Sequence, residues 1–168
     1  MRWFWIDRFT EVVSGSHATA IKSVSLSEEH LHDHFYAYPV MPNSLIIEGM
    51  AQTAGLLVSE FNDFAERVIL AKLAKVQFHR AAVPGDVLTY RAKIEQIKRD
   101  GAMVTTTSHV GDELQAEAEI FFAHLDVRES EGRELFEPAG FLHWLKLLRF
   151  FDVGVKQDGS PIPVPQVD

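Results

Sequence analysis

The chain has 168 residues, which fits one domain, and 46% of them are apolar, which is enough to bury a core. The net charge of −8 argues against nucleic acid as a partner, and the absence of cysteine excludes disulfide bonds and cysteine nucleophiles. No segment approaches the ~20 consecutive apolar residues of a membrane span, and the apolar part of the first residues is too short for a secretory signal. We therefore expect a cytoplasmic enzyme or binding protein.

The first part of the chain is predicted to form two strands followed by a long loop. Residues 9–26 alternate loosely between apolar and polar side chains and are interrupted at Ser14-Gly15-Ser16, a pattern typical of two strands joined by a turn. Residues 27–42 are polar and then aromatic, and they contain Pro39 and Pro42. We expect them to form an ordered loop of the kind that often carries functional residues.

Residues 43–60 predict a central buried helix. Apolar side chains cover almost every face of this segment, whereas a helix on a protein surface shows a single apolar stripe. Small residues within it, such as Gly49 and Ala54, would let a sheet approach closely. Its start is marked by Pro42-Asn43-Ser44, where either polar side chain can cap the free backbone N–H groups.

The segment after this helix alternates with a period of two, as strands do, and contains the turn signals Asp100-Gly101 and Gly111-Asp112. The predicted strands are residues 75–78, 87–97, 103–110 and 114–125. One buried helix followed by a run of antiparallel strands predicts the α+β class.

The last part of the chain is predicted to be an extension of the main domain, so the expected division is 1–125 and 126–168. Residues 126–137 are charged and indicate a linker, and residues 138–151 predict a helix with a broad apolar face. We expect this helix to pack on the domain or on a neighbouring subunit, with a lid or a membrane-surface helix as the alternative. Residues 160–165 are rich in proline and predict an extended tail.

Two residues carry the candidate chemistry, His34 in the aromatic loop and Glu48 within the apolar helix. A carboxyl group among apolar side chains must be neutral, paired or functional, and one shielded from water can give a proton near neutral pH. Gln52 lies one helical turn further on and can form a hydrogen bond with Glu48. From these residues alone, a structural role and a catalytic role are equally well supported.

Several short motifs with fixed spacings join these residues. They are His34-Phe35, Pro39-Val40-Met41-Pro42 and Ile46-Ile47-Glu48-Gly49-Met50-Ala51-Gln52, followed by Val76-Gln77-Phe78 and Val83-Pro84-Gly85-Asp86. Together they resemble the active-site motif of the β-hydroxyacyl–acyl-carrier-protein dehydratases of fatty acid synthesis, including the step of 14 residues from His34 to Glu48. The resemblance covers about residues 5–125.

This resemblance implies a hot-dog fold, in which an antiparallel sheet wraps around a central helix. It also implies a homodimer or a trimer of dimers with shared active sites, each pairing His34 of one chain with Glu48 of its partner. The Val40 backbone carbonyl would hold the histidine ring, and the Asn43 backbone N–H would face the thioester carbonyl.

The implied reaction is the dehydration of (3R)-3-hydroxyacyl thioesters, linked to an acyl carrier protein, to trans-2-enoyl thioesters. His34 would act as general base and Glu48 as general acid, and neither a metal nor an organic cofactor is implied. Candidates to line the acyl tunnel are Phe35, Tyr36, Met41 and Phe78. Because carrier proteins of this kind are acidic, the basic segment within residues 61–100 is a candidate dock: Lys72, Lys75, Arg80, Arg91, Lys93, Lys98 and Arg99.

The match has three departures, which keep other interpretations open. Asp33 and Asn43 stand where the family usually has glycine, and Tyr36 stands where it usually has proline. A hot-dog acyl-thioesterase and a catalytically inactive homologue that binds acyl thioesters are the alternatives. A zinc site is a further hypothesis, because His30, His32 and His34 would share one face if this segment were a strand.

Overall fold

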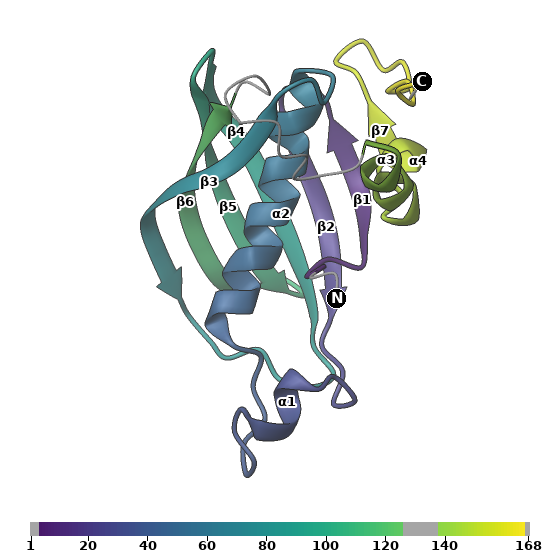
Figure 1. The fold of residues 1–168 in the computed structure, drawn as a ribbon. Helices are drawn as coiled ribbons and strands as arrows, with labels where there is room; N and C mark the ends of the chain where they lie inside the picture. The colour runs from purple at the N-terminus through teal and green to yellow at the C-terminus, as the bar shows by residue number, and fades with distance from the viewer. Residues whose placement is uncertain (1–3, 126–137, 167–168) are drawn as a thin grey trace.

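The computed structural model describes residues 4–125 and 138–166, which form one seven-stranded sheet around a long helix (Figure 1). The strand order is β3-β6-β5-β4-β2-β1-β7, and every neighbouring pair is antiparallel except β1 with β7. The strands are β1 Arg8–Val13, β2 His17–Ser23, β3 Arg67–Phe78, β4 Val87–Lys98, β5 Gly101–Val110, β6 Glu113–Leu125 and β7 Gly154–Val155. The helices are α1 His30–Asp33, α2 Asn43–Phe61, α3 Pro138–Leu147 and α4 Phe150–Val153. The predicted α+β class and the sheet wrapped around a central helix are confirmed.

Helix α2 lies in the hollow of the curved sheet and contacts strands β2 to β6 (Figure 1). Gly49 permits this close approach, because a Cβ atom there would lie 2.5 Å from Cε2 of Tyr90 and 2.6 Å from the Trp5 carbonyl oxygen. The face of α2 toward the sheet includes Ile46, Met50 and Leu57, each with no exposed surface. Burial of these side chains drives the packing of helix on sheet.

The start of α2 differs from the expected capping. Pro42 is the N-cap residue, with extended backbone, and no side chain caps the helix. The Pro42 carbonyl accepts hydrogen bonds from Leu45 N (2.9 Å) and Ile46 N (3.2 Å), so Asn43 and Ser44 already lie within the first turn. Their exposed side chains are therefore past the position from which a cap is made.

Strand β3 is much longer than the predicted 75–78, and it lies at one edge of the sheet. Its residues from Ile69 to Gln77 are all exposed, so neither face imposes the alternation by which strands are recognised. The opposite edge is formed by β7, which pairs with β1 over only two residues. The turn before β5 also lies one residue earlier than predicted, at Arg99-Asp100.

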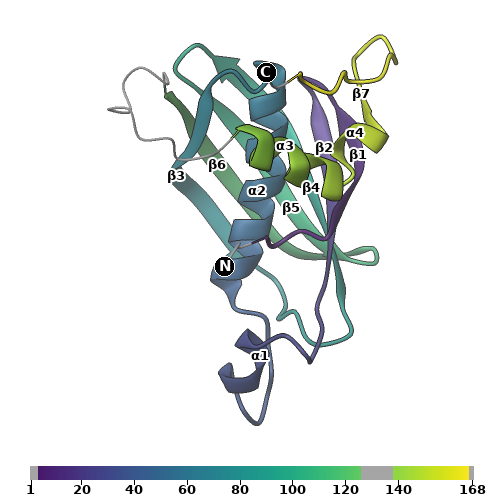
Figure 2. The same cartoon turned by 45° about the vertical axis from the view of Figure 1, so that its right-hand side comes forward.

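The C-terminal extension packs on β1 rather than standing apart from the sheet. Phe150 contacts Phe9 at 5.0 Å between ring centroids, and Figure 2 shows α3 on the same side of the sheet as α2. The prediction of a single helix over 138–151 is wrong. The segment is divided into α3 and α4, because Arg149 has left-handed backbone (φ 59°). The predicted linker 126–137 lies outside the described residues.

The Pro-rich tail continues along β7 in extended form, with Ile162 buried and Val155 bridging to Pro161. Among the described residues, no helix is long and apolar enough to cross a membrane.

Glu60, near the C-terminal end of α2, is a buried carboxyl group. Burial is the main cause that raises its pKa above the ordinary value of 4.5, and a hydrogen bond with Ser14 opposes the shift. The folded protein therefore holds this proton at pH values where the unfolded chain has lost it. The stability that Glu60 contributes is present below pH 4.5 and is lost as the pH rises through the folded-state pKa.

We accordingly expect Glu60→Gln to raise the melting temperature at pH 7, because it removes a carboxylate that burial disfavours. The difference from the wild type should shrink as the pH falls toward 4.5. Thermal unfolding measured across this range checks the prediction, with the exposed Glu29→Gln as matched control. A Glu60→Gln protein that is less stable than the wild type at pH 7 would contradict it.

Candidate active site

His34 lies in the loop that follows α1, and its ring is oriented by the backbone of the same loop. Its Nδ1 lies 3.1 Å from the Val40 carbonyl oxygen, and Val40 N donates in return to the His34 carbonyl oxygen at 2.9 Å. Because a carbonyl oxygen can only accept, Nδ1 must carry the hydrogen. The neutral ring then presents the lone pair of Nε2, the atom that a general base needs.

The predicted lining residues fall into two groups in a single chain. Phe35 and Tyr36 are exposed, by 60% and 93% of their surface, and Phe35 stacks on the His34 ring at 4.5 Å. Met41 is only 1% exposed and belongs to the core, and Phe78 is half-buried at the end of β3. The aromatic loop thus presents a large apolar surface to solvent.

The N-terminus of α2 lies near this loop, since Pro42 both ends the loop and caps the helix (Figure 1). Within the described chain, the Asn43 N–H has no hydrogen-bond acceptor. Free N–H groups and the positive end of the helix dipole make this a place where negative charge is stabilised. The Asn43 side chain is exposed and does not occupy the cap.

Glu48 is exposed in the single chain, contrary to the burial expected from its apolar neighbours. The sheet of the chain covers the face of α2 that carries Met50 and Leu57, and Glu48 lies on the uncovered face. Its Oε1 accepts a hydrogen bond from Gln52 Nε2 at 2.9 Å, the contact expected one helical turn apart. Gln52 is held in turn by Trp5 N, which donates to Gln52 Oε1 at 2.9 Å.

Within one chain, the structure does not bring His34 and Glu48 into contact. No hydrogen bond or ion pair joins the two residues in the described ranges. The histidine belongs to the loop beyond the N-terminus of α2, and the carboxylate belongs to the second turn of the helix, on its open face. An acid–base pair made of these groups therefore needs either a movement or a second chain.

The zinc hypothesis is not supported by the backbone of residues 30–33. They form helix α1, so His30 and His32 do not share a face as they would on a strand. His30 packs edge-on against Trp5 at 5.0 Å, with its pKa lowered mainly by burial, while His32 is exposed. No group of three potential metal ligands occurs among the described residues.

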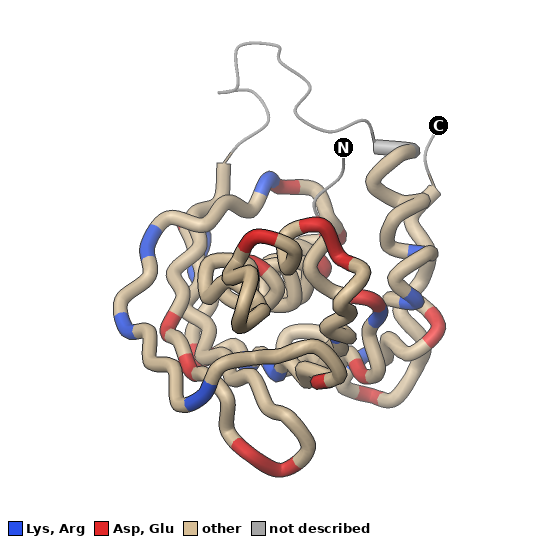
Figure 3. The backbone as a smooth tube through the Cα atoms, turned by 90° about the horizontal axis from the view of Figure 1, so that it is seen from below, with Lys and Arg blue, Asp and Glu red and all other residues tan. Residues whose placement is uncertain are grey.

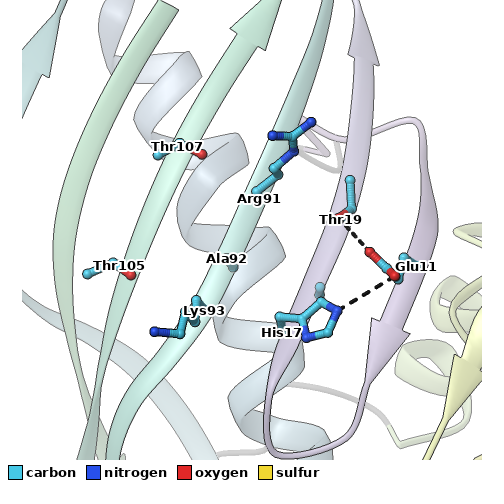
Figure 4. Close-up of a pocket in the computed structure, with 9 residues that line it drawn as sticks. Glu11, His17, Thr19, Arg91, Ala92, Lys93, Thr105 and Thr107 are labelled. Carbon is cyan, nitrogen blue, oxygen red and sulfur yellow. Dashed lines mark hydrogen bonds and ion pairs between the residues drawn. The ribbon is translucent and has the colours of Figure 1, made fainter. Parts of the chain in front are cut away.

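A depression of about 510 Å³ lies elsewhere, on the outer face of the sheet (Figure 4). Arg91 and Lys93 on β4 line it with His17 and Thr19 on β2, and α2 lies behind the sheet. It contains neither a helix N-terminus nor the loop of His34. We take the loop and α2 as the candidate active site, because His34, Glu48 and the free N–H groups of the helix N-terminus occur there.

The predicted basic dock is divided between separate strands. Lys72 and Lys75 lie on β3, whereas Arg91 and Lys93 lie on β4, with β6 and β5 between them. Lys75 and Lys93 also have carboxylate partners, at 3.5 Å and 3.1 Å. Figure 3 shows Lys and Arg distributed around the outline of the molecule among Asp and Glu. The segment therefore does not form one basic surface.

A buried ion pair that we did not predict from the sequence lies between Lys22 at the end of β2 and Glu28 in the loop. Their Nζ and Oε1 atoms are 2.6 Å apart, and the Lys22 side chain is 7% exposed. A signal was present, because Ala18, Ala20 and Lys22 occupy alternate positions of one strand and so face the core together.

These features define a hot-dog protein with a candidate acid–base site beside a helix N-terminus. The FabA-like domain family matches residues 3–119. Curated relatives are 3-hydroxyacyl-[acyl-carrier-protein] dehydratases named FabZ. That of Pelotomaculum thermopropionicum is 37% identical over 119 residues, covering 70% of this chain and 85% of the relative. That of Clostridioides difficile is 32% identical over 119 residues, covering 70% and 84%. The chain belongs to the FabA-like family of 3-hydroxyacyl-[acyl-carrier-protein] dehydratases.

Solved structures show that the fold is shared more widely. A Streptococcus mutans protein bound to acetyl CoA superposes with a TM-score of 0.62 at 15% identity, covering 75% of this chain and 94% of that one. A conserved protein of Pseudomonas aeruginosa gives 0.59 at 20% identity, covering 70% and 87%. Sequence identities this low show that the fold is shared, and we infer no further property from them.

Proposed function

We propose that this protein dehydrates (3R)-3-hydroxyacyl thioesters, carried by an acyl carrier protein, to trans-2-enoyl thioesters. His34 takes the proton from C2, the C3–oxygen bond breaks, and Glu48 gives a proton to the departing hydroxyl, so that water leaves and a C2=C3 double bond remains. The FabZ relatives act, by their names, on this class of substrate. We place the activity in the cytoplasm as part of the same proposal.

The observation that carries the proposal is the hydrogen bond between His34 Nδ1 and the Val40 carbonyl. It selects the tautomer in which Nε2 is free to accept a proton, and it also restrains the ring. The Asn43 N–H at the start of α2 supplies the second requirement. Removal of the C2 proton creates enolate-like charge on the thioester oxygen, and a free N–H at a helix N-terminus stabilises such charge.

We further propose that two chains associate through β3, the open edge of the sheet. Within the described residues no strand pairs with one side of β3, and Ile69, Leu70 and Leu73 expose 37–42% of their surface. A long exposed apolar edge strand is a template for pairing with another chain. Pairing of β3 with a second β3 would be isologous, as in most homodimers, and would continue the sheet across the seam.

This association would complete the site. In a single chain the aromatic loop with His34 and the open face of α2 with Glu48 are both exposed and unconnected. In the dimer, the aromatic loop of one chain would cover the open face of α2 of the other. Both surfaces would then be buried, and His34 of one chain would pair with Glu48 of the other. Whether dimers assemble further into hexamers does not affect this pairing.

The direct test is turnover of a 3-hydroxyacyl thioester series on acyl carrier protein, following enoyl formation and free thiol release in the same reaction. We expect enoyl product with no thiol release above the uncatalysed rate. Thiol release without enoyl product would instead support a hot-dog thioesterase. Binding of the thioester without either product would support an inactive homologue.

A further inference from the structure

Lys22 is a charged side chain in an unusual environment for lysine, because it is almost fully buried at the end of β2. Its Nζ lies 2.6 Å from Glu28 Oε1, 2.7 Å from the Ser23 carbonyl oxygen and 3.6 Å from Asp7 Oδ1. The ammonium group therefore donates two hydrogen bonds and has Asp7 as a second, more distant ion-pair partner. The attraction within a buried ion pair offsets the cost of removing the charges from water only where the geometry is good and further hydrogen bonds are made.

The two carboxylates around Lys22 bind different segments of the backbone. Glu28 uses its second oxygen to accept a hydrogen bond from Ser25 N at 3.0 Å, which fixes the first turn of the loop. Asp7 uses its second oxygen to accept from Ser23 N at 2.7 Å, which ties the N-terminal segment to β2. Lys22 is thus the common point of the N-terminal segment, β2 and the loop.

Both segments lead to the candidate site. From Glu28 the chain enters α1, whose Leu31 is buried in the core, and His34 directly follows the last residue of α1. From Asp7 the chain leads back to Trp5, which packs on His30 and whose N–H holds Gln52, the partner of Glu48. The orientation of both proposed catalytic groups therefore depends on segments that Lys22 joins.

The energetics of buried ion pairs indicate what this pair contributes. Replacing both partners of such a pair with apolar side chains is often neutral for stability, whereas removing one partner leaves an uncompensated charge. The pair is thus a weak source of net stability but a strong directional constraint. In a catalytic loop, a displacement of about 1 Å can lower the rate by about 100-fold.

We propose that Lys22 is a positioning residue for the dehydration, which holds the His34 loop in place through Glu28 and the N-terminal segment through Asp7. This inference rests on the proposed role of His34 as general base. It assigns no direct contact with substrate to Lys22, so its effect must act through the unit that His34 forms with Glu48.

A double-mutant cycle tests this dependence. Three variants are made in both the wild-type and the His34→Ala backgrounds: Lys22→Met, Lys22→Met combined with Glu28→Met, and the exposed control Arg149→Met.

In the wild-type background we expect both Lys22 variants to lower kcat by about 10- to 100-fold with little change in KM. In the His34→Ala background the same changes should lower the residual rate by less than about 2-fold, because residues that act as a unit are non-additive. Arg149→Met, which breaks an exposed ion pair at 3.1 Å, should change neither rate.

If Lys22→Met alone does not fold, the variant with both Lys22→Met and Glu28→Met tests the inference. Full kcat in a folded double variant would overturn the inference, and so would equal losses in both backgrounds. Failure of both variants to fold would also overturn it, in favour of a role in stability alone. A wild-type rate for His34→Ala itself would instead reject the proposed function, whatever Lys22 does.

Discussion

His34→Ala is expected to lower kcat for enoyl formation by about 10²–10⁴-fold, the usual contribution of a positioned general base. Nε2 of His34 is the atom that the Val40 hydrogen bond leaves free to accept the C2 proton. KM should change little, because the imidazole acts on the proton during reaction and is not the main contact of the acyl chain. Steady-state kinetics on a 3-hydroxyacyl thioester provide the measurement.

His32→Ala is the matched control, since His32 is an exposed histidine two residues earlier on α1. It should retain wild-type kcat, and both variants should retain the wild-type melting temperature to within a few degrees. The proposed role of His34 would be rejected if the two alanine variants had the same kcat.

Glu48→Gln is expected to lower kcat by about 10²–10⁴-fold, because an amide cannot give a proton to the departing hydroxyl. The substitution preserves the shape of the side chain. It also allows a hydrogen bond with Gln52, whose Nε2 lies 2.9 Å from Glu48 Oε1 in the wild type. Since Glu48 is exposed in the single chain, folding of each chain should be unaffected.

Two further variants sharpen the test of Glu48. Glu48→Asp keeps a carboxyl group and should recover part of the lost rate, whereas Glu29→Gln neutralises an exposed loop carboxylate and should have no effect. If Glu48→Gln and Glu29→Gln were equally active, the assignment of Glu48 as general acid would be wrong.

Much of the fold could be predicted because local patterns and tertiary packing agree. The alternation before and after Ser14-Gly15-Ser16 and the apolar helix at 43–60 correspond to β1, β2 and α2. The fixed spacing from His34 to Glu48 indicates the family from the sequence. Short-range sequence signals are strong where one face of an element is buried and the other exposed.

The misses occur where that condition fails. Strand β3 is exposed on both faces, so its first residues show no alternation, and the sequence predicts the strand only from residue 75. Glu48 was expected to be buried because α2 is apolar on almost every side, but the sheet of a single chain covers only part of the helix. Both misses fall on surfaces that the proposed dimer would cover.

The break between α3 and α4 had no sequence signal. Arg149 adopts a left-handed backbone without glycine or asparagine, the residues that usually mark such a position. Its neighbours Leu148 and Phe150 are both buried, and such tertiary packing cannot be read from a local pattern. The ion pair of Lys22 is different, since the alternation of β2 already placed it toward the core.

The central claim is that each active site combines His34 of one chain with Glu48 of another, and mixing of two inactive proteins tests it most directly. His34→Ala and Glu48→Gln chains are unfolded together, refolded as a 1:1 mixture and assayed for enoyl formation. Random association makes half of the dimers mixed, and each mixed dimer holds one intact site of two, so activity should recover to about a quarter of the wild type. Activity that stays at the level of the separate variants, in a mixture shown to contain mixed dimers, would contradict a shared site.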